Sequence, residues 1–242
     1  MSKHVIFCLP FLERPTKHVI KALEDSIPVI TKAGWTEGLC QSVGSAYISW
    51  ARATMLRKAL DAKADAIVFV DYDISFRPAD LLKLLETPGE VVAGTYRYKQ
   101  DAEEYMGGWH IDASMRPVVR PDGCLKASGV PAGFLKLTPA AVGLFMAAYP
   151  ELIYGEAWRP SVDLFNHGSF AGTWWGEDMA FCRRWTEKCG DIWLIPDLDI
   201  AHWAGDTPFP GNLHRWLMRQ PGGRDDPARR AETSHGGAVL AR

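Results

Sequence analysis

Short apolar runs alternate with longer amphipathic segments through the first seventy residues, and this alternation restricts the fold more than any other feature. Residues 4–9 and 66–70 are apolar runs of strand length, and residues 35–41 alternate as a strand does. Between them, residues 16–31 and 49–62 space their apolar side chains at helical intervals. The resulting β-α-β-α-β order predicts the α/β class, with a central, mostly parallel sheet flanked by helices.

The alternation continues less regularly as far as residue 220. The predicted helices are 78–85, 139–149, 177–188 and 212–220, and the predicted strands are 90–95, 133–137 and 192–195. The segment 96–128 predicts a loop or β-rich excursion along one wall of a cleft, and the segment 155–175 predicts a loop-rich stretch. We expect Pro10 to end the first strand and Pro28 to kink or end the first helix.

Charge and cysteine content argue against several classes of protein. The formal net charge of -2 gives no global positive field that would attract nucleic acid or an anionic membrane. The five cysteines are odd in number and include no CxxC pair, which argues against a disulfide framework or a zinc site and favours a reducing compartment. The apolar run 4–9 is too short for a signal peptide or a membrane span. We therefore expect a soluble cytoplasmic protein.

Two carboxylates follow the apolar run 66–70 where the predicted strand ends. They belong to Asp71-Tyr72-Asp73, and alternate residues of an extended segment point the same way, so both carboxylates can face one site. Mg²⁺ and Mn²⁺ prefer such oxygens, and a cation shared with a diphosphate neutralises charge on a departing nucleotide. The structural alternative is that the two aspartates only end the strand and stabilise the next turn.

Four segments, in sequence order, resemble the GT-A glycosyltransferases, a family with a nucleotide-binding α/β half, a DxD motif and an acceptor half. Asp71-Tyr72-Asp73 is similar to the DxD motif, and Trp175-Gly176-Glu177-Asp178 resembles the acidic xED motif at the start of a helix. Ala51-Arg52-Ala53 lies where relatives carry an arginine near the nucleotide. Ala201-His202-Trp203 is similar to the late histidine that completes the metal site in many members.

The resemblance implies a single domain over residues 1–221, with a nucleotide-sugar half over about 1–100 and an acceptor half over about 101–221. It implies Mn²⁺ or Mg²⁺ as the cofactor and a UDP-sugar as the donor. The implied metal ligands are Asp71, Asp73 and His202. The residues expected at the donor are Pro10, Arg14, Arg52, Asp71, Tyr72 and Trp175. Asp178 is the expected general base, and Glu177 is expected to orient acceptor or sugar hydroxyls.

Each candidate also has a structural interpretation. Glu177 and Asp178 are acids in the first turn of a helix, where the helix macrodipole favours them. His202 fits an ordinary buried histidine, and Arg52 fits a solvated helix face that it shares with neighbouring cations. These interpretations stay open at the level of sequence.

Two other functions fit parts of the pattern. A nucleotidyltransferase also pairs carboxylates with Mg²⁺ in an α/β sheet, but residues 8–12 lack the glycines of its phosphate loop. A non-catalytic carbohydrate-binding protein would use the aromatic side chains, but it would not need the paired acids and the late histidine.

A soluble single-domain transferase of this kind resembles bacterial or phage enzymes that glycosylate glycans, proteins or a hydroxymethylated DNA base. The acceptor is therefore expected to be a hydroxyl group of one of these three classes. A local basic cluster near the end could meet phosphates; it consists of Arg215, Arg219, Arg224, Arg229 and Arg230. Acidic neighbours reduce the local positive charge of this cluster. The composition of residues 222–242 favours a flexible, solvated tail.

Overall fold

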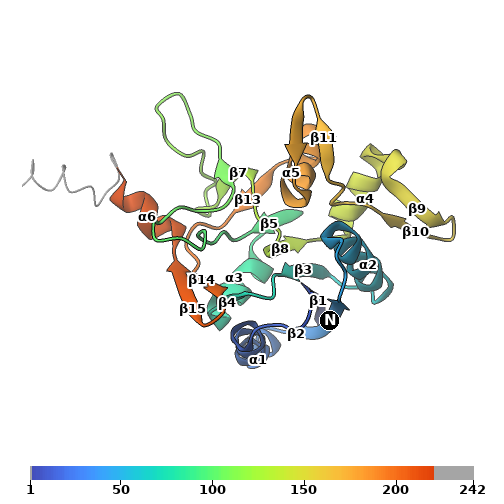
Figure 1. Cartoon of the computed structure of the whole chain (residues 1–242), viewed down its shortest axis with the longest axis horizontal. Helices are drawn as coiled ribbons and strands as arrows, with labels where there is room; N and C mark the ends of the chain where they lie inside the picture. Colours follow the sequence, from blue (N-terminus) through green and yellow to red (C-terminus); the bar gives the residue numbers. More distant parts are fainter. Residues whose placement is uncertain (1, 221–242) are drawn as a thin grey trace, which may run out of the picture.

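A mixed eight-stranded sheet forms the centre of the molecule (Figure 1). The computed structural model describes residues 2–220, so the predicted tail lies outside the described residues. The strand order is β2 (Trp35–Val43), β1 (Lys3–Phe11), β3 (Ala66–Val70), β8 (Phe134–Leu137), β5 (Val91–Ala93), β13 (Ile192–Leu194), β7 (Leu125–Gly129) and β6 (Gly108–Trp109). Only β8 and β7 oppose the common direction of the other six strands. The predicted α/β class with a mostly parallel sheet is confirmed.

Helices cover both faces of this sheet, and each face has its own hydrophobic core. The helices are α1 (Lys17–Lys32), α2 (Ile48–Asp61), α3 (Pro78–Glu86), α4 (Pro139–Ala148), α5 (Glu177–Lys188) and α6 (Leu213–Arg219). Side chains of α2, α4 and α5 pack on one face with Ile6 and Cys8 of β1, and side chains of α1 and α3 pack on the other with Val5 and Phe7. Successive residues of a strand point to opposite faces, so β1, apolar from Val5 to Phe11, fills both cores.

Local signals explain where several helices begin. The Thr16 hydroxyl accepts a hydrogen bond from the amide of Val19 at the start of α1, and the Thr138 hydroxyl accepts one from Ala141 at the start of α4. Pro139 then occupies the first position of α4, where its missing N–H costs nothing. No helix within residues 2–220 combines the length and the apolar character that crossing a membrane requires.

Smaller sheets border the central one. β4 (Ile74–Phe76) pairs with β14 (Ile200–Ala204), which also pairs with β15 (Thr207–Gly211). Two antiparallel hairpins project from the side of α2 and α5 (Figure 1); they are β9 (Ile153–Glu156) with β10 (Arg159–Val162), and β11 (Gly168–Phe170) with β12 (Thr173–Trp175).

Three local predictions were wrong. β1 continues through Pro10 to Phe11, because its pairing with β3 ends at Cys8 and Pro10 needs no amide on that side. α1 does not end at Pro28, one of the two outcomes predicted there, but continues to Lys32, since its buried face packs against the sheet on both sides of the proline. The segment 155–175 forms the strands of two hairpins instead of loops alone.

Candidate active site

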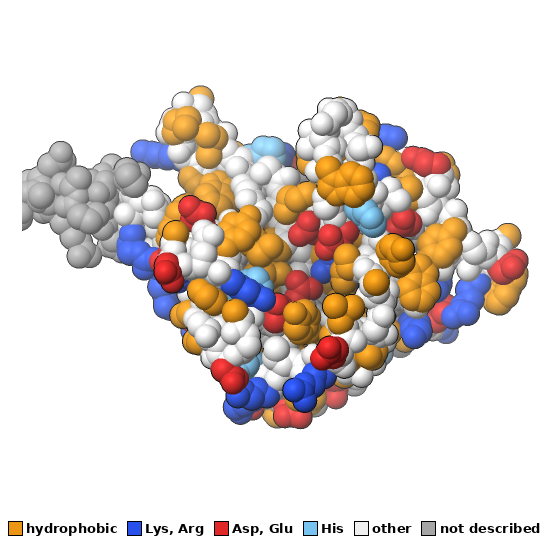
Figure 2. All heavy atoms as spheres, in the orientation of Figure 1, with side chains coloured by type: hydrophobic (Ala, Val, Ile, Leu, Met, Phe, Trp, Pro, Cys, Tyr) orange, Lys and Arg blue, Asp and Glu red, His pale blue; other side chains and the backbone are white. Residues whose placement is uncertain are grey.

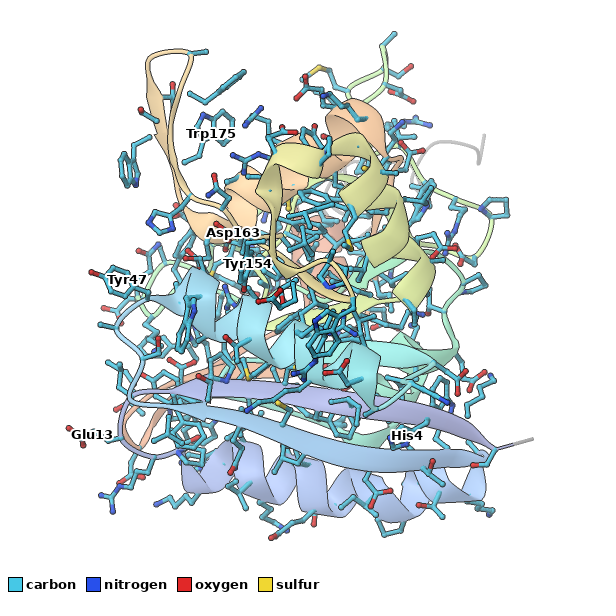
Figure 3. All side chains as sticks on the ribbon, turned by 90° about the vertical axis from the view of Figure 1, so that its right-hand side faces the viewer. His4, Glu13, Tyr47, Tyr154, Asp163 and Trp175 are labelled. Atoms are coloured by element: carbon cyan, nitrogen blue, oxygen red, sulfur yellow. The ribbon has the colours of Figure 1, made fainter. Side chains whose placement is uncertain are left out.

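A pocket of about 340 Å³ opens where β1, β2 and β3 end, as expected for ligands of open α/β sheets. Figure 3 shows Glu13 and Tyr47 together on the side where β1 and β2 end, with His4 at the opposite end of β1. Each strand end contributes to the wall: Pro10 and Phe11 from β1, Ser42 from β2 and the segment after β3. The remaining wall comes from the start of α2, the loop after β5, β14 and α5.

Asp71 lies in a partly buried network around the buried side chain of Arg52. The Arg52 guanidinium donates from Nη2 to Asp71 Oδ1 at 2.9 Å and from Nη1 to Glu177 Oε1 at 2.6 Å. The Tyr96 hydroxyl donates to the other Asp71 oxygen at 2.9 Å. A Cβ at Gly133 would overlap both the Tyr96 hydroxyl and the Asp71 carboxylate, so only glycine leaves room for this contact. The solvated-face interpretation of Arg52 is therefore excluded, because its side chain is only 4% exposed.

Burial and charge act in opposite directions on this network. Burial lowers the pKa of Arg52, but Asp71 and then Glu177 raise it by more, so the guanidinium stays charged. Burial, followed by the Asp71 charge, raises the pKa of Tyr96 well above its usual range. The phenol therefore keeps its proton and can donate a hydrogen bond to Asp71. Both oxygens of the Asp71 carboxylate are thus occupied by protein donors.

Asp73 and His202 form a second pair in the same pocket. His202 Nε2 lies 3.6 Å from Asp73 Oδ2, and the Lys99 ammonium contacts the same oxygen. His202 Nδ1 lies 2.9 Å from the carbonyl oxygen of Arg97, which can only accept, so Nδ1 carries a proton and donates it to this bond. Burial alone raises the pKa of Asp73, but His202 and Lys99 lower it by more, and the net pKa is below its ordinary value. Asp73 is therefore a carboxylate at neutral pH.

The pairing of β4 with β14 is what brings His202 to Asp73. His202 stands opposite Ile74 in the antiparallel register, and the Trp203 amide donates to the Asp73 carbonyl at 2.7 Å. A shift of one residue would turn the imidazole to the other face of this sheet.

Asp178 lies in the first turn of α5, directly after Glu177, which lines the pocket. Its Oδ1 accepts a hydrogen bond from the Met179 amide at 2.7 Å. Burial, with a further contribution from the Glu177 charge, raises the pKa of Asp178 above its ordinary value. A raised pKa suits a group that must take up a proton during a reaction.

The structure does not bring all predicted donor residues together. Pro10, Arg52, Asp71 and Tyr72 line the pocket, whereas Arg14 and Trp175 do not. Trp175 donates its indole N–H to the Phe170 carbonyl across the β11–β12 hairpin. Alternate residues of a strand point to opposite sides, and the neighbouring Trp174 is the one that is 70% exposed.

Sequence reasoning missed Tyr96, Lys99 and Gly133, all of which contact the aspartates or adjoin them. Tyr96 directly follows the predicted strand 90–95, so its place at the carboxyl end of a strand was a usable signal. Lys99 comes from the irregular segment after this strand, where no periodic pattern places a side chain.

Acidic side chains gather near the middle of the face seen in Figure 2, among hydrophobic side chains. A larger cavity of about 530 Å³ lies beside α6, but its charged lining is satisfied internally. Arg77 and Arg215 pair with Asp199, and Arg219 pairs with Glu103. The smaller pocket, where carboxylates and a histidine converge, is therefore the candidate site.

We expect Arg52→Ala to lower the free energy of unfolding by up to about 3 kcal/mol, because it removes the cation that two partly buried carboxylates share. Arg52→Lys should be intermediate, since one ammonium cannot bridge both acids as the planar fork does. Urea denaturation measures the loss. Arg159→Ala, which breaks an ion pair between more exposed side chains, is the control and should shift the midpoint far less. Equal midpoints for Arg52→Ala and wild type would contradict the network.

Three solved structures are similar to the chain at low sequence identity. The catalytic domain of Drosophila beta1,4-galactosyltransferase 7, in complex with xylobiose, is 12% identical over 88% of this chain and 71% of that chain, with a TM-score of 0.46. GalNAc-T7 with UDP, GalNAc and Mn²⁺ is 10% identical over 97% of this chain and 54% of that chain, with a TM-score of 0.47. S. aureus TarS 1-349 is 11% identical over 90% of this chain and 64% of that chain, with a TM-score of 0.43. At these values the likeness says nothing about the reaction. No protein-family model matches the chain, and no curated protein matches it in sequence.

Proposed function

We propose that the chain is a metal-dependent glycosyltransferase that moves a sugar from a nucleoside diphosphate donor to an acceptor hydroxyl. The observation that carries this proposal is the convergence of Asp73 and His202 in a pocket at the carboxyl ends of three strands, with the partly buried acid Asp178 next to the pocket-lining Glu177. The pocket volume of about 340 Å³ lies in the range of small-ligand sites.

The residues present fit a divalent cation bound together with its substrate. Within residues 2–220, no three acidic, histidine or cysteine side chains cluster as a complete metal site. Mg²⁺ and Mn²⁺ need only one or two protein ligands when phosphates and water supply the others. Asp73 Oδ2 and His202 Nε2 would be these two ligands. The Nδ1 bond to the Arg97 carbonyl orients the imidazole as partners of metal-bound histidines do.

Asp71, predicted as a third ligand, has both oxygens occupied by Arg52 and Tyr96. In our proposal it holds the Arg52 guanidinium in the wall of the pocket, and it reaches a cation or the ribose only through water. The nucleobase and ribose would lie against Pro10, Phe11 and Ser42, at the ends of β1 and β2.

The proposed transfer is a single displacement. Asp178 takes the proton of the acceptor hydroxyl as its oxygen bonds to the anomeric carbon, and the bond from this carbon to the diphosphate oxygen breaks with its electron pair. A bound Mn²⁺ or Mg²⁺ would neutralise the charge that develops on the departing diphosphate. Glu177 accepts a hydrogen bond from Arg52 and so keeps the first turn of α5 beside the pocket.

The acceptor class follows less directly from the site. Trp50 belongs to α2, whose start lines the pocket, and Trp174 belongs to the hairpin that directly precedes α5. Both are exposed, and aromatic faces of this kind suit sugar rings. A glycan is therefore the acceptor that the site favours. Of the basic cluster proposed for phosphates, Arg215 and Arg219 are already ion-paired, and the other three arginines lie outside the described residues.

A thermal-shift screen tests this function. A nucleotide-sugar of the correct donor class at 100 times its Kd should raise Tm by about 5 to 10 °C, and only when Mn²⁺ or Mg²⁺ is present. UMP, which lacks the second phosphate, is the matched ligand control and should give a much smaller shift. Equal shifts in Mn²⁺ and in EDTA would count against a metal-dependent transferase.

A further inference from the structure

The Lys99 ammonium occupies the oxygen that the proposed cation needs. Its contact is with Asp73 Oδ2, the same atom that faces His202 Nε2 at 3.6 Å. Within the described residues, Lys99 Nζ has no other hydrogen-bond or ion-pair partner. Two cations on one carboxylate oxygen would repel each other strongly in this partly buried pocket. A divalent ion and Lys99 therefore compete for Asp73.

Hydrogen bonds at its tip and at its base fix the backbone of the loop that carries Lys99. Arg97 donates to the carbonyls of Gln100 and Asp101 and so closes the tip of the loop. The Met106 amide donates to the Tyr96 carbonyl at 3.1 Å and closes its base. The lysine side chain itself is still 31% exposed and has a flexible stem, so it can leave Asp73 without unfolding the loop.

A diphosphate supplies the new partner that such a displaced ammonium requires. Phosphate oxygens form strong charge-assisted hydrogen bonds with lysine, and the diphosphate would lie beside Asp73 in the proposed complex. The divalent ion can then take the Asp73 oxygen with no net loss of ion pairs.

We propose that Lys99 is a resident counter-ion of Asp73 that moves to the donor diphosphate when a divalent cation and the donor bind together. This inference rests on the proposed function. It makes Lys99 a positioning residue that weakens cation binding in the absence of nucleotide and couples the binding of the two ligands. A purely structural role, holding the loop 96–106 against the sheet, would produce no such coupling.

Free Mn²⁺, measured by electron paramagnetic resonance, tests the proposal without any need for turnover. In the absence of nucleotide, Lys99→Met should bind Mn²⁺ about tenfold more tightly than wild type. UDP should raise the Mn²⁺ affinity of wild type, and this increase should be about tenfold smaller in Lys99→Met. Lys99→Arg keeps the positive charge and should behave as wild type. Lys126→Met is the matched control, because Lys126 also pairs with one aspartate and is 35% exposed.

The outcomes separate this inference from the function on which it rests. If wild type binds Mn²⁺ with UDP but Lys99→Met has unchanged affinities with and without UDP, the transferase proposal survives and the role of Lys99 is wrong. If wild type binds no Mn²⁺ even with UDP, both proposals fail. Circular dichroism spectra of all four proteins show whether a changed affinity reflects loss of fold.

Discussion

Asp178→Asn should lower kcat by about 10² to 10⁴, the usual contribution of a positioned general base. A sugar hydroxyl is a poor nucleophile at neutral pH, and the amide cannot accept its proton. The affinity for the donor should survive, because proton transfer follows binding. Asn has nearly the shape of Asp, so its packing in the first turn of α5 is retained. Single-turnover kinetics with a separate calorimetric Kd for the donor measure both quantities.

Asp191→Asn provides the control for this prediction, since Asp191 pairs with Lys126, both side chains are partly exposed, and neither lines the pocket. The product should have the inverted anomeric configuration, because in a single displacement the acceptor oxygen attacks the face of the anomeric carbon opposite to the departing diphosphate. An NMR spectrum with retained configuration, or near-normal turnover of Asp178→Asn, would rule out Asp178 as the base.

The pH profile of wild type gives an independent check. Only the ionised Asp178 acts as a base, so kcat/KM should fall as the pH falls through its folded-state pKa. Burial and the Glu177 charge raise this pKa, so the fall should begin at a higher pH than for an ordinary aspartate. Asp178→Asn should lose this acidic limb, whereas Asp191→Asn should keep it.

Asp73→Ala should abolish the metal dependence of donor binding. Removing a residue that only hydrogen-bonds to a metal ligand commonly weakens metal affinity by about 10- to 100-fold. Removing the ligand itself should therefore weaken metal affinity by more than about 100-fold. Calorimetry of UDP binding in Mn²⁺ and in EDTA should show a large difference for wild type and none for Asp73→Ala. Asp73→Asn, which keeps the size of the side chain, should behave like Asp73→Ala.

Asp25→Ala removes an exposed carboxylate on α1 and should retain the full difference between Mn²⁺ and EDTA. His202→Ala should reproduce part of the Asp73→Ala effect, because it removes the second ligand. Equal UDP affinity of wild type and Asp73→Ala in Mn²⁺ would falsify the metal site at Asp73.

Elements with strong local signals were predicted well from sequence. The strand Ala66–Val70 and the helix Glu177–Lys188 have the predicted bounds. Each ends where the periodic pattern of apolar side chains changes, and this pattern depends only on neighbours in the chain. The same logic placed Asp71 and Asp73 at the end of a buried strand, in the wall of the pocket.

The sequence by itself determined the alternation of strands and helices and the delivery of Asp71 and Asp73 to the carboxyl edge of the sheet. Only the tertiary structure decided which partners meet them. Arg52 and Tyr96 converge on Asp71 from α2 and the loop after β5, and Lys99 reaches Asp73 from that same loop. His202 faces Asp73 because β14 pairs with β4 in one register. The physical reason is that periodicity encodes which face of an element is buried, whereas strand register and loop path depend on contacts between residues far apart in the chain.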